Sequence, residues 1–402
     1  MAADGAPASF SLILVCSTYP PVIGGSEVEA QRVCSGLIGR GHRVTVATTG
    51  GPPMPALHQW TDPAGVPVLL YAASWSGMMK DVMFAISVAW LLFRERRNYQ
   101  TVYFLMQGLH LAVGLPVARL LGKTILMKVG GSGVLPLMAR SATGRLELRW
   151  LRKWAARVMI LNEGMRAEAL AARLPAERLV WMPNPVDTER FRPVSQAEQS
   201  RLRVEHNFPP NALIIIYTGR LAPEKSLHLL VEAFAAVQRQ RTLAYLALVG
   251  DGPARAVLEE QARRLGCEDS ARFVGSVEPA EVPRWLQMAD VFALVSLSEG
   301  FPCALVEAMS VGLASVVSDI PANQQLVQPE KHGLLAPAGD SAATAAALLR
   351  LIDEHELRRR MGTEARRTVK ERYAIEQVLG RYETLLSETG GTRRTEMTPS
   401  EP

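Results

Sequence analysis

The stretch from Ala289 to Asp319, ADVFALVSLSEGFPCALVEAMSVGLASVVSD, constrains the fold more than any other part of the chain. Its first part, Asp290–Ser296, is a short run of apolar residues that is typical of a strand buried on both faces. A loop rich in Gly and Pro follows, and Pro302 suits the first position of a helix, where its missing N–H costs nothing. We expect the helix to end at Gly312 and a second buried strand to occupy Ala314–Ser318. The stretch therefore predicts one βαβ unit.

Two glutamates stand at chemically useful places in this unit. Glu299 lies on the loop before the helix, and Glu307 lies about a turn and a half inside it. We expect the N–H groups of Cys303 and Ala304 to be unpaired at the helix N-terminus, where they can bind an anion or a sugar hydroxyl. Two glutamates at such positions are ordinarily both exposed to solvent. However, Glu307 lies in the most apolar helix of the chain, where a carboxylate without a partner would be costly.

The segment EGFPCALVEAM, which begins at Glu299, resembles the E-x7-E motif of glycosyltransferase family 4. Members of this family are retaining enzymes with the GT-B fold, an α/β architecture of two Rossmann-like, doubly wound domains facing a central cleft. The resemblance implies that Glu299 lies against the donor sugar and that Glu307 binds the ribose hydroxyls of the nucleotide. It also implies that the donor contacts a run of residues after Glu299, namely Gly300, Phe301, Pro302, Cys303, Ala304 and Leu305.

A second motif precedes this one in the same predicted domain. The strand Ala212–Gly219 leads into Arg220-Leu-Ala-Pro-Glu-Lys225-Ser226, which is similar to the family's G-R-x-x-x-E-K-G loop with Ser226 in place of the last glycine. Without the resemblance, these are two surface cations. With it, Arg220 and Lys225 are expected to neutralise the donor diphosphate and to stabilise it as a leaving group.

The glycines and the acidic residues of the chain bear on the choice of cofactor. Gly250-Asp-Gly-Pro resembles the family's G-x-G-P turn, and the resemblance implies that Gly250 contacts the substrate. The turn lacks the third glycine of a dinucleotide fingerprint, so NAD is not expected. The tripeptide D-x-D does not occur in the sequence. We therefore expect neither a metal ion nor another cofactor, with Arg220 and Lys225 supplying the positive charge.

The first half of the chain carries a looser match to the family. After a first strand at Phe10–Ser17, Gly24 and Gly25 precede a helix that Ser26 is expected to cap, with Glu29 at the capping-box position. A glycine pair in this place is either a plain turn or a close approach to a phosphate, and the resemblance favours the second.

Two more strands, Thr101–Gln107 and Thr124–Val129, would bring Gln107 and His110 to the edge of the same sheet as contacts to substrate. A single histidine in such a place is more often structural than catalytic. Many family members have a histidine after the strand that matches Thr124–Val129. This chain has Lys128-Val-Gly-Gly there, so the resemblance does not assign the group that contacts the sugar or receives the acceptor's proton.

A chain of 402 residues is too long for one ordinary core, which favours two domains. The resemblance runs from Phe10 to about Glu388. It places an acceptor-binding domain at residues 1–190 and a nucleotide-sugar-binding domain at 191–372. A helix at 373–388 would cross back to the first domain, and the polar segment 389–402 is expected to be disordered.

Composition limits the class of protein further. The net charge of +5 suits a diphosphate ligand or an anionic membrane surface, and is too small to indicate nucleic acid. The four cysteines have no C-x-x-C spacing, which is typical of reduced thiols in the cytoplasm. Ser11–Cys16 is too short for the apolar core of a signal peptide. The longest apolar stretch, Val82–Phe93, has 12 residues and cannot span a bilayer, so it predicts a buried helix.

The segment Arg145–Arg157 is strongly basic and holds Trp150 and Trp154 one helical turn apart. One interpretation is a solvated helix face whose tryptophans point inward. The other is peripheral contact with anionic lipid on the inner face of the cell membrane.

Taken with the resemblance, these features predict a retaining glycosyltransferase that moves a sugar from a nucleotide-diphosphate sugar, such as a UDP-sugar, to an acceptor hydroxyl. A polysaccharide, a lipid-linked sugar and a small-molecule glycoside all remain open as acceptors. A nucleotide-sugar epimerase of the same fold is an alternative, although its usual paired carboxylates and histidine are not evident. A catalytically inactive sugar-binding or membrane-adaptor relative is another, although such a protein has no reason to keep Glu299, Glu307, Arg220 and Lys225.

Overall fold

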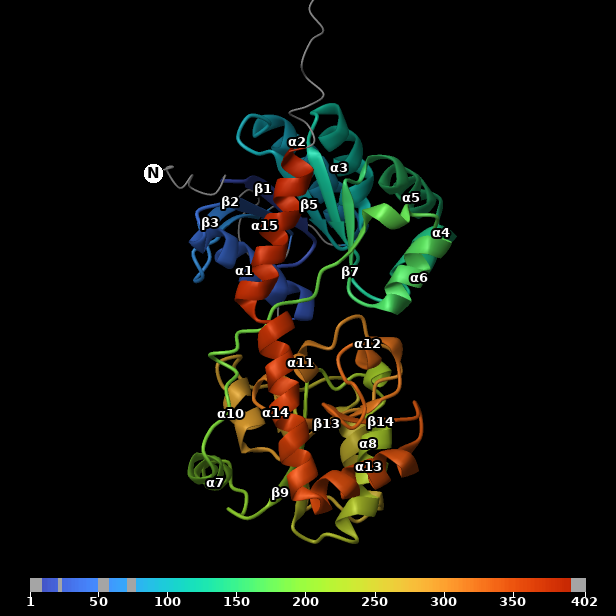
Figure 1. The fold of residues 1–402 in the computed structure, drawn as a ribbon. Coiled ribbons are helices and arrows are strands. Elements are labelled where there is room, and N and C mark those ends of the chain that lie inside the picture. The colour runs from blue at the N-terminus through green and yellow to red at the C-terminus, as the bar shows by residue number, and fades with distance from the viewer. Residues whose placement is uncertain (1–8, 21–23, 50–57, 71–76, 392–402) are drawn as a thin grey trace, which may run out of the picture. The chain divides into compact units, whose positions relative to one another are not determined.

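The computed structural model describes residues 9–20, 24–49, 58–70 and 77–391 (Figure 1). These form two compact units that are treated separately below. The N-unit comprises Met1–Pro185 together with Ile375–Pro402, and the C-unit comprises Val186–Ala374. In the described ranges, no helix combines the length and the apolar character that crossing a bilayer requires.

The described part of the N-unit is built on one sheet of eight strands in the order β3-β4-β2-β1-β5-β6-β7-β8. Neighbouring strands are parallel, except that β3 runs antiparallel to β4. The strands are β1 (Ser11–Cys16), β2 (Arg43–Thr48), β3 (His58–Thr61), β4 (Pro67–Leu70), β5 (Thr101–Leu105), β6 (Thr124–Lys128), β7 (Arg157–Ile160) and β8 (Leu179–Trp181). The helices are α1 (Gly25–Gly39), α2 (Gly77–Arg94), α3 (Leu109–Leu120), α4 (Val134–Arg140), α5 (Ala142–Trp154), α6 (Glu163–Ala171), the 3-10 turn η1 (Ala176–Arg178) and α15 (Ile375–Gly391).

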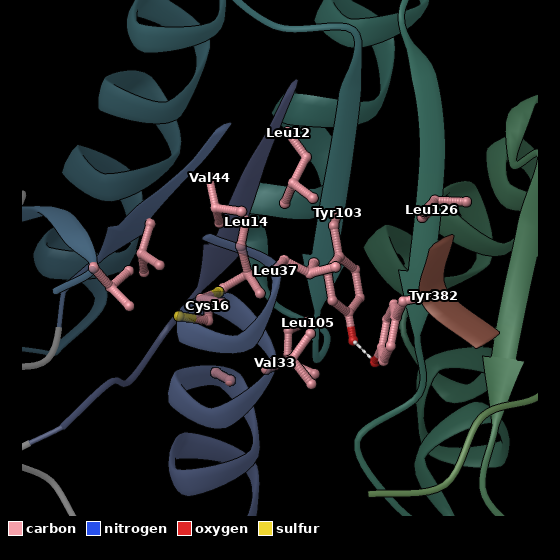
Figure 2. Close-up of a cluster of buried hydrophobic side chains, with 14 of the residues drawn as sticks. Leu12, Leu14, Cys16, Val33, Leu37, Val44, Tyr103, Leu105, Leu126 and Tyr382 are labelled. Atoms are coloured by element: carbon pink, nitrogen blue, oxygen red, sulfur yellow. Dashed lines mark hydrogen bonds between the residues drawn. The ribbon is translucent and has the colours of Figure 1, made fainter. Parts of the chain in front are cut away.

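The core of the N-unit lies between β1, α1 and the C-terminal helix α15. Every residue of β1 is buried, as the continuous apolar run predicts for a central parallel strand. Figure 2 shows Leu14 and Cys16 of β1 in one cluster with Val33 of α1. In the same view the hydroxyls of Tyr103 on β5 and Tyr382 on α15 are hydrogen-bonded at 3.1 Å. Helix α15 therefore completes a core whose other members come from the first half of the chain.

The C-unit is a second doubly wound domain, with a parallel sheet in the order β11-β10-β9-β12-β13-β14 among the described residues. Its strands are β9 (Leu213–Thr218), β10 (Ala244–Val249), β11 (Ala271–Gly275), β12 (Val291–Leu294), β13 (Ala314–Ser318) and β14 (Gly333–Ala336). Its helices are α7 (Gln196–Glu205), the 3-10 turn η2 (Pro223–Lys225), α8 (Leu227–Gln238), α9 (Arg255–Arg264), α10 (Val282–Met288), α11 (Cys303–Ser310), α12 (Pro321–Gln324), α13 (Ser341–Asp353) and α14 (His355–Arg372).

The strands predicted from apolar runs are all present, because each is buried on both faces of a parallel sheet. The sequence analysis did not predict β3, β4 and β8, which are short strands of three or four residues near the ends of the N-unit sheet. The prediction of a buried helix at Val82–Phe93 was wrong in one respect. Helix α2 forms there, but Ile86, Trp90 and Phe93 are exposed.

The C-terminal helix is longer than the sequence predicted. Helix α15 continues to Gly391, and Thr389, which was placed in a disordered tail, is buried and donates a hydrogen bond to Leu385 O at 2.8 Å. The rest of the predicted tail, 392–402, lies outside the described residues.

Helix α14 and the turn that follows α11 approach so closely at one point that only glycine fits. A Cβ atom at Gly362 would lie 1.9 Å from the carbonyl oxygen of Gly312, a contact with rigid backbone. Gly380 on α15, by contrast, has open space around the position of its Cβ.

These two helical glycines should respond oppositely to alanine. We expect Gly362→Ala to destabilise the protein by about 1–3 kcal/mol, because the packed backbones must separate. Gly380→Ala should stabilise it by about 0.5–1 kcal/mol, because alanine has the higher helix propensity. Urea denaturation of both variants against the unsubstituted protein measures the difference, and equal stability of the two variants would contradict the packing described.

Candidate active site

The predicted donor residues of the C-unit gather where the order of its sheet reverses. Strands β9 and β12 are neighbours in space although they are not consecutive in the chain, and doubly wound sheets bind ligands beyond the carboxyl ends of their strands at such a reversal. Strand β9 leads into Arg220 and Lys225, and β12 leads into Glu299. The topology of the sheet thus brings together two motifs that are more than 70 residues apart in the chain.

An ion pair joins the two loops. The ammonium group of Lys225 donates to both carboxylate oxygens of Glu299, at 2.8 and 3.0 Å. The Glu299 side chain is only 9% exposed and that of Lys225 is 24% exposed, so water screens the pair weakly. An ammonium has three donors, which allows Lys225 to hold Glu299 and a phosphate oxygen at the same time.

Arg220 stands on the same loop in a more open position. Its side chain is 68% exposed and pairs with Glu224 at 2.5 Å, four residues along. Exposed pairs of this kind are worth little, so the guanidinium can exchange Glu224 for a bound phosphate at small cost. The hydroxyl of Tyr217 donates to the Arg220 carbonyl at 3.1 Å and holds the loop against β9.

Gly250 positions this loop through backbone contact. Its φ is +135°, and a Cβ atom there would lie 1.9 Å from the carbonyl oxygen of Gly219, directly before Arg220. Its N–H donates to Gly275 O at 2.8 Å. The structure thus shows Gly250 packed against the cation loop, and its contact with the substrate stays a prediction.

Helix α11 begins differently from the prediction. Pro302 is the N-cap residue instead of the first helical residue, and the Cys303 N–H donates to Phe301 O at 2.9 Å. The expectation that the Cys303 N–H is unpaired was therefore wrong, because the short turn before the helix already uses it. Gly312 follows the helix with φ +86°, as predicted for its end.

The side chains around α11 divide into a buried and an accessible set. Leu305 is buried, whereas Gly300, Phe301, Cys303, Ala304 and Glu307 are partly accessible. The ring of Phe301 packs at 6.0 Å from that of Tyr373. Glu307 is thus half-buried on the helix that follows Glu299, as the motif predicts.

The predicted residues of the N-unit gather at a corresponding reversal, between β1 and β5. Gly24 and Gly25 follow β1, and Gln107 follows β5. Gly24 is itself the N-cap of α1, so the prediction that Ser26 caps this helix was wrong. The predicted capping partner, Glu29, is buried instead and pairs with Lys128 of β6.

His110 has the environment of a structural residue. Its ring lies 5.2 Å from that of Phe84 and 6.5 Å from that of Phe104, and it is 2% exposed. Burial lowers the pKa of His110 to about 4, so the imidazole is neutral at physiological pH. Its Nε2 atom and the Oε1 atom of neighbouring Gln107 are buried and have no hydrogen-bond partner among the described residues.

Beside Gln107 lies a cavity of about 500 Å³ that the sequence analysis missed. It is lined by the start of α3 and by residues of α4, α5 and their connection, which are Gln107, Gly108, Leu109, Leu137, Met138, Arg140, Ser141, Thr143, Gly144 and Glu147. Glu147 is 4% exposed, and burial raises the pKa of its carboxyl to about 7. A signal was present, since Glu147 is the only acidic residue of the basic segment and lies between two leucines.

The comparisons with known proteins agree with this architecture. The family model described as "Glycosyltransferase Family 4" matches residues 23–190, and the one described as "Glycosyl transferases group 1" matches residues 198–368. Together the two models cover most of both units. The chain belongs to the GT-B glycosyltransferases of family 4.

Among curated family 4 relatives, the chain is 29% identical to putative glycosyltransferase EpsD of Bacillus subtilis, over 55% of this chain and 58% of that protein. It is 29% identical to N-acetyl-alpha-D-glucosaminyl L-malate synthase of Bacillus anthracis, over 47% and 49%. The chain thus spans only about half to three fifths of the length of these two relatives. A GDP-mannose-dependent alpha-(1-6)-phosphatidylinositol monomannoside mannosyltransferase of Mycobacterium tuberculosis is 27% identical over 89% of this chain and 93% of that protein.

Solved structures show the same GT-B fold. Anabaena Alr3699/HepE in complex with UDP and glucose aligns with a TM-score of 0.79 at 19% identity, over 94% of this chain and 100% of that one. Sucrose-phosphate synthase from Thermosynechococcus elongatus aligns with a TM-score of 0.79 at 20% identity, over 95% and 100%.

Two departures from the family 4 motifs acquire a structural explanation. Ser226, which replaces a glycine, has a left-handed backbone conformation with φ +51°, and this conformation is the reason that glycine suits the position. Lys128 lies at the end of β6, before the place where many members have a histidine. Its buried ammonium donates to Glu29 and, at 2.8 Å, to Asn184.

The raised pKa of Glu147 makes stability depend on pH. The carboxyl binds its proton more tightly in the folded chain, with a pKa of about 7 against a usual value of 4.5. Its contribution to the free energy of unfolding is therefore full below about pH 4.5 and falls as the pH rises through about 7. We expect Glu147→Gln to remove this decline, so that the variant gains stability relative to the unsubstituted protein between pH 5 and pH 8.

The urea unfolding midpoints of the variant and of the unsubstituted protein, at pH 5 and at pH 8, measure this gain. The exposed Glu163 of α6 provides a matched Glu→Gln control. The same pH dependence in the Glu147→Gln variant and the unsubstituted protein would contradict a buried, proton-binding carboxyl.

Proposed function

We propose that the protein is a retaining glycosyltransferase that transfers a sugar from a nucleotide-diphosphate sugar to an acceptor hydroxyl. The observation that carries the proposal is the Lys225–Glu299 ion pair beside Arg220, at the reversal of the C-unit sheet. Two cations and one weakly screened carboxylate converge where a doubly wound sheet binds its ligand. The names of the relatives support the donor class, since one uses GDP-mannose and one was solved with UDP and glucose.

Transfer begins with departure of the diphosphate. The bond between the anomeric carbon and the phosphate oxygen breaks, and its electron pair leaves with the diphosphate. Arg220 and Lys225 stabilise this growing negative charge, which lowers the barrier because the charge is larger in the transition state than in the bound donor. Positive charge develops on the sugar at the same time, and the carboxylate of Glu299 stabilises it while holding the sugar in position.

The acceptor hydroxyl then attacks the anomeric carbon from the face that the diphosphate leaves. A new carbon–oxygen bond forms with the original configuration, and the departing phosphate oxygen is the base on that face that can take the hydroxyl proton. Glu307 binds the ribose hydroxyls, and the backbone from Gly300 to Leu305 lies along the donor. Because two cations supply the charge, we propose that no metal ion is needed.

We propose that the acceptor binds in the cavity of the N-unit. Sugar hydroxyls are hydrogen-bond donors and acceptors, and the cavity presents Gln107 and Glu147 among apolar side chains such as Leu137. The Oε1 atom of Gln107 is buried without a hydrogen-bond partner among the described residues, which is costly, so an acceptor that pairs with it binds selectively. Gly24 and Gly25 at the end of β1 are a further proposed contact of this unit. A polysaccharide in biosynthesis, a lipid-linked sugar and a small glycoside all offer such hydroxyls.

A cytoplasmic location and membrane contact through Arg145–Arg157 stay predictions from the sequence. In the structure, Trp150 and Trp154 of this segment stack on each other at 5.4 Å and are half-buried. Arg152 donates to the carbonyl of Ala172 at 2.8 Å. The exposed face of this segment therefore carries charge but only a small apolar surface.

The cation pair provides the first test of the proposal. Arg220→Ala and Lys225→Ala should each lower kcat by roughly 10²–10³, the usual cost of removing one donor to a developing anion. The melting temperature should change little, and activity should persist in EDTA. Release of UDP and of GDP from a panel of donors, with candidate acceptors, gives the rates.

Arg263→Ala is the matched control, since Arg263 is 62% exposed and pairs with Glu260 three residues away, much as Arg220 is 68% exposed and pairs with Glu224 four residues away. Unchanged turnover in the Lys225→Ala variant, or activity that requires added Mn²⁺ or Mg²⁺, would count against the mechanism. Isomerised donor without transfer would indicate an epimerase.

The second test concerns the nucleotide. Glu307→Ala should weaken donor binding by on the order of 1.5–3 kcal/mol, because it removes a charged hydrogen-bond partner of the ribose. Calorimetric titration with nucleotide-sugar measures the loss, and the exposed Glu356 of α14 provides a Glu→Ala control. Unchanged affinity in Glu307→Ala would exclude the ribose role.

A further inference from the structure

Helix α2 of the N-unit has two apolar faces, and the residues that the structure describes cover only one of them. The covered face consists of Phe84, Ala85, Val88, Leu91 and Leu92, which are all buried, and α2 packs against α3. Large apolar side chains also stand on the other face, which is turned to solvent. These are Met79, Ile86, Trp90 and Phe93, with exposed fractions of 51, 55, 46 and 57%.

The spacing of the exposed residues shows that they form a continuous stripe. Steps of seven, four and three residues from Met79 to Phe93 bring every member to the same side of an α-helix. Scattered exposed apolar residues are ordinary on a soluble protein, but a contiguous apolar row of this length marks a binding surface. We define the α2 face as Met79, Ile86, Trp90 and Phe93.

Cations border the C-terminal end of the α2 face. The guanidinium of Arg94 lies 4.8 Å from the ring centre of Trp90, and that of Arg96 lies 4.4 Å from the ring centre of Phe93. Arg97 is exposed beside them. The acidic residues on or directly after this helix are Asp81, near its start, and Glu95, which accepts from Arg94 at 2.9 Å and from Asn98.

The neighbouring helix α3 extends this border. Lys123, directly after α3, donates to the carbonyls of Arg96 and Tyr99 at 2.5 and 2.7 Å, which brings the ends of the two helices together. There α3 exposes Leu120 at 86% and also Arg119. Apolar and cationic side chains thus meet at the same end of both helices.

We propose that the α2 face, with Arg94, Arg96 and Arg97, docks the N-unit on the surface of an anionic lipid bilayer. Aromatic and aliphatic side chains enter the boundary between headgroups and acyl chains, and the guanidinium groups remain at the level of the lipid phosphates. Charge favours lipid over a second copy of the chain, because the cations on and directly after α2 outnumber Asp81 and Glu95, so a twofold contact through α2 would bring together two surfaces of net positive charge. This docking does not depend on the proposed transfer reaction.

Vesicle co-sedimentation tests the proposal on the full-length protein. Vesicles of phosphatidylcholine alone are compared with vesicles that contain 30% phosphatidylglycerol, at low and at high salt. We expect binding only with phosphatidylglycerol, and a decrease of binding with salt. The triple variant Arg94→Ser, Arg96→Ser and Arg97→Ser should lower the partition coefficient by about 100-fold, which corresponds to about 1 kcal/mol per cation. The triple variant Ile86→Ser, Trp90→Ser and Phe93→Ser should also lose binding.

Two control variants match these changes elsewhere on the chain. Arg145→Ser, Arg149→Ser and Lys153→Ser remove exposed charge from α5. Val204→Ser and Val257→Ser remove side chains that are 57 and 66% exposed in the C-unit. Both variants should keep binding, and circular dichroism should show that all the variants are folded.

Tryptophan fluorescence reports whether the surface enters lipid. Lipids brominated on the acyl chain should quench part of the emission, and Trp90→Phe should remove that quenched part while the protein still sediments with vesicles. Protein that stays in the supernatant with phosphatidylglycerol at low salt would overturn the proposal. So would binding that the α5 variant alone abolishes, or a dimer in sedimentation velocity that the apolar α2 variant dissociates.

Discussion

Parallel strands place every functional element of this protein, because such strands can be joined only by crossovers. Apart from the loop after the antiparallel strand β3, the loops that follow the strands therefore emerge at one edge of each sheet. In both units the order of the sheet then reverses beside its first strand, between β1 and β5 and between β9 and β12. The pairing of the strands thus places Lys225 near Glu299 in the C-unit. It also places Gln107 at the same sheet edge as Gly24 in the N-unit, and neither placement requires a side-chain contact.

Within the N-unit, a buried ion pair adds a second constraint. Lys128 and Glu29 are 1% and 4% exposed, and Tyr382 of α15 donates to the same carboxylate at 3.4 Å. Burial raises the pKa of Glu29, and the ammonium of Lys128 opposes this shift. Removal of either partner would leave the other charge uncompensated in the core. The helix that ends the described chain therefore contacts a charge pair built from its first half.

The candidate site shows how far local sequence predicts geometry. The order strand, loop, helix and strand around Glu299 was predictable, because apolar runs and Gly–Pro punctuation are properties of neighbouring residues. The cavity beside Glu147 was not, because its walls come from α3, α4 and α5 together. Pro302 and Ser26 were misplaced by one or two residues, since helix starts depend on which backbone N–H groups the preceding turn already uses.

The sequence alone determined the two-domain α/β class, the buried strands and the motif residues Arg220, Lys225, Glu299 and Glu307. Each of these follows from a pattern of residues that are close together in the sequence. Only the tertiary structure decided which apolar residues are covered. Helix α2 carries apolar residues on two faces, but α3 packs against one of them, and Ile86, Trp90 and Phe93 on the other are exposed. Hydrophobicity favours burial of a side chain but does not specify the surface that will cover it, because that surface forms only when the chain folds.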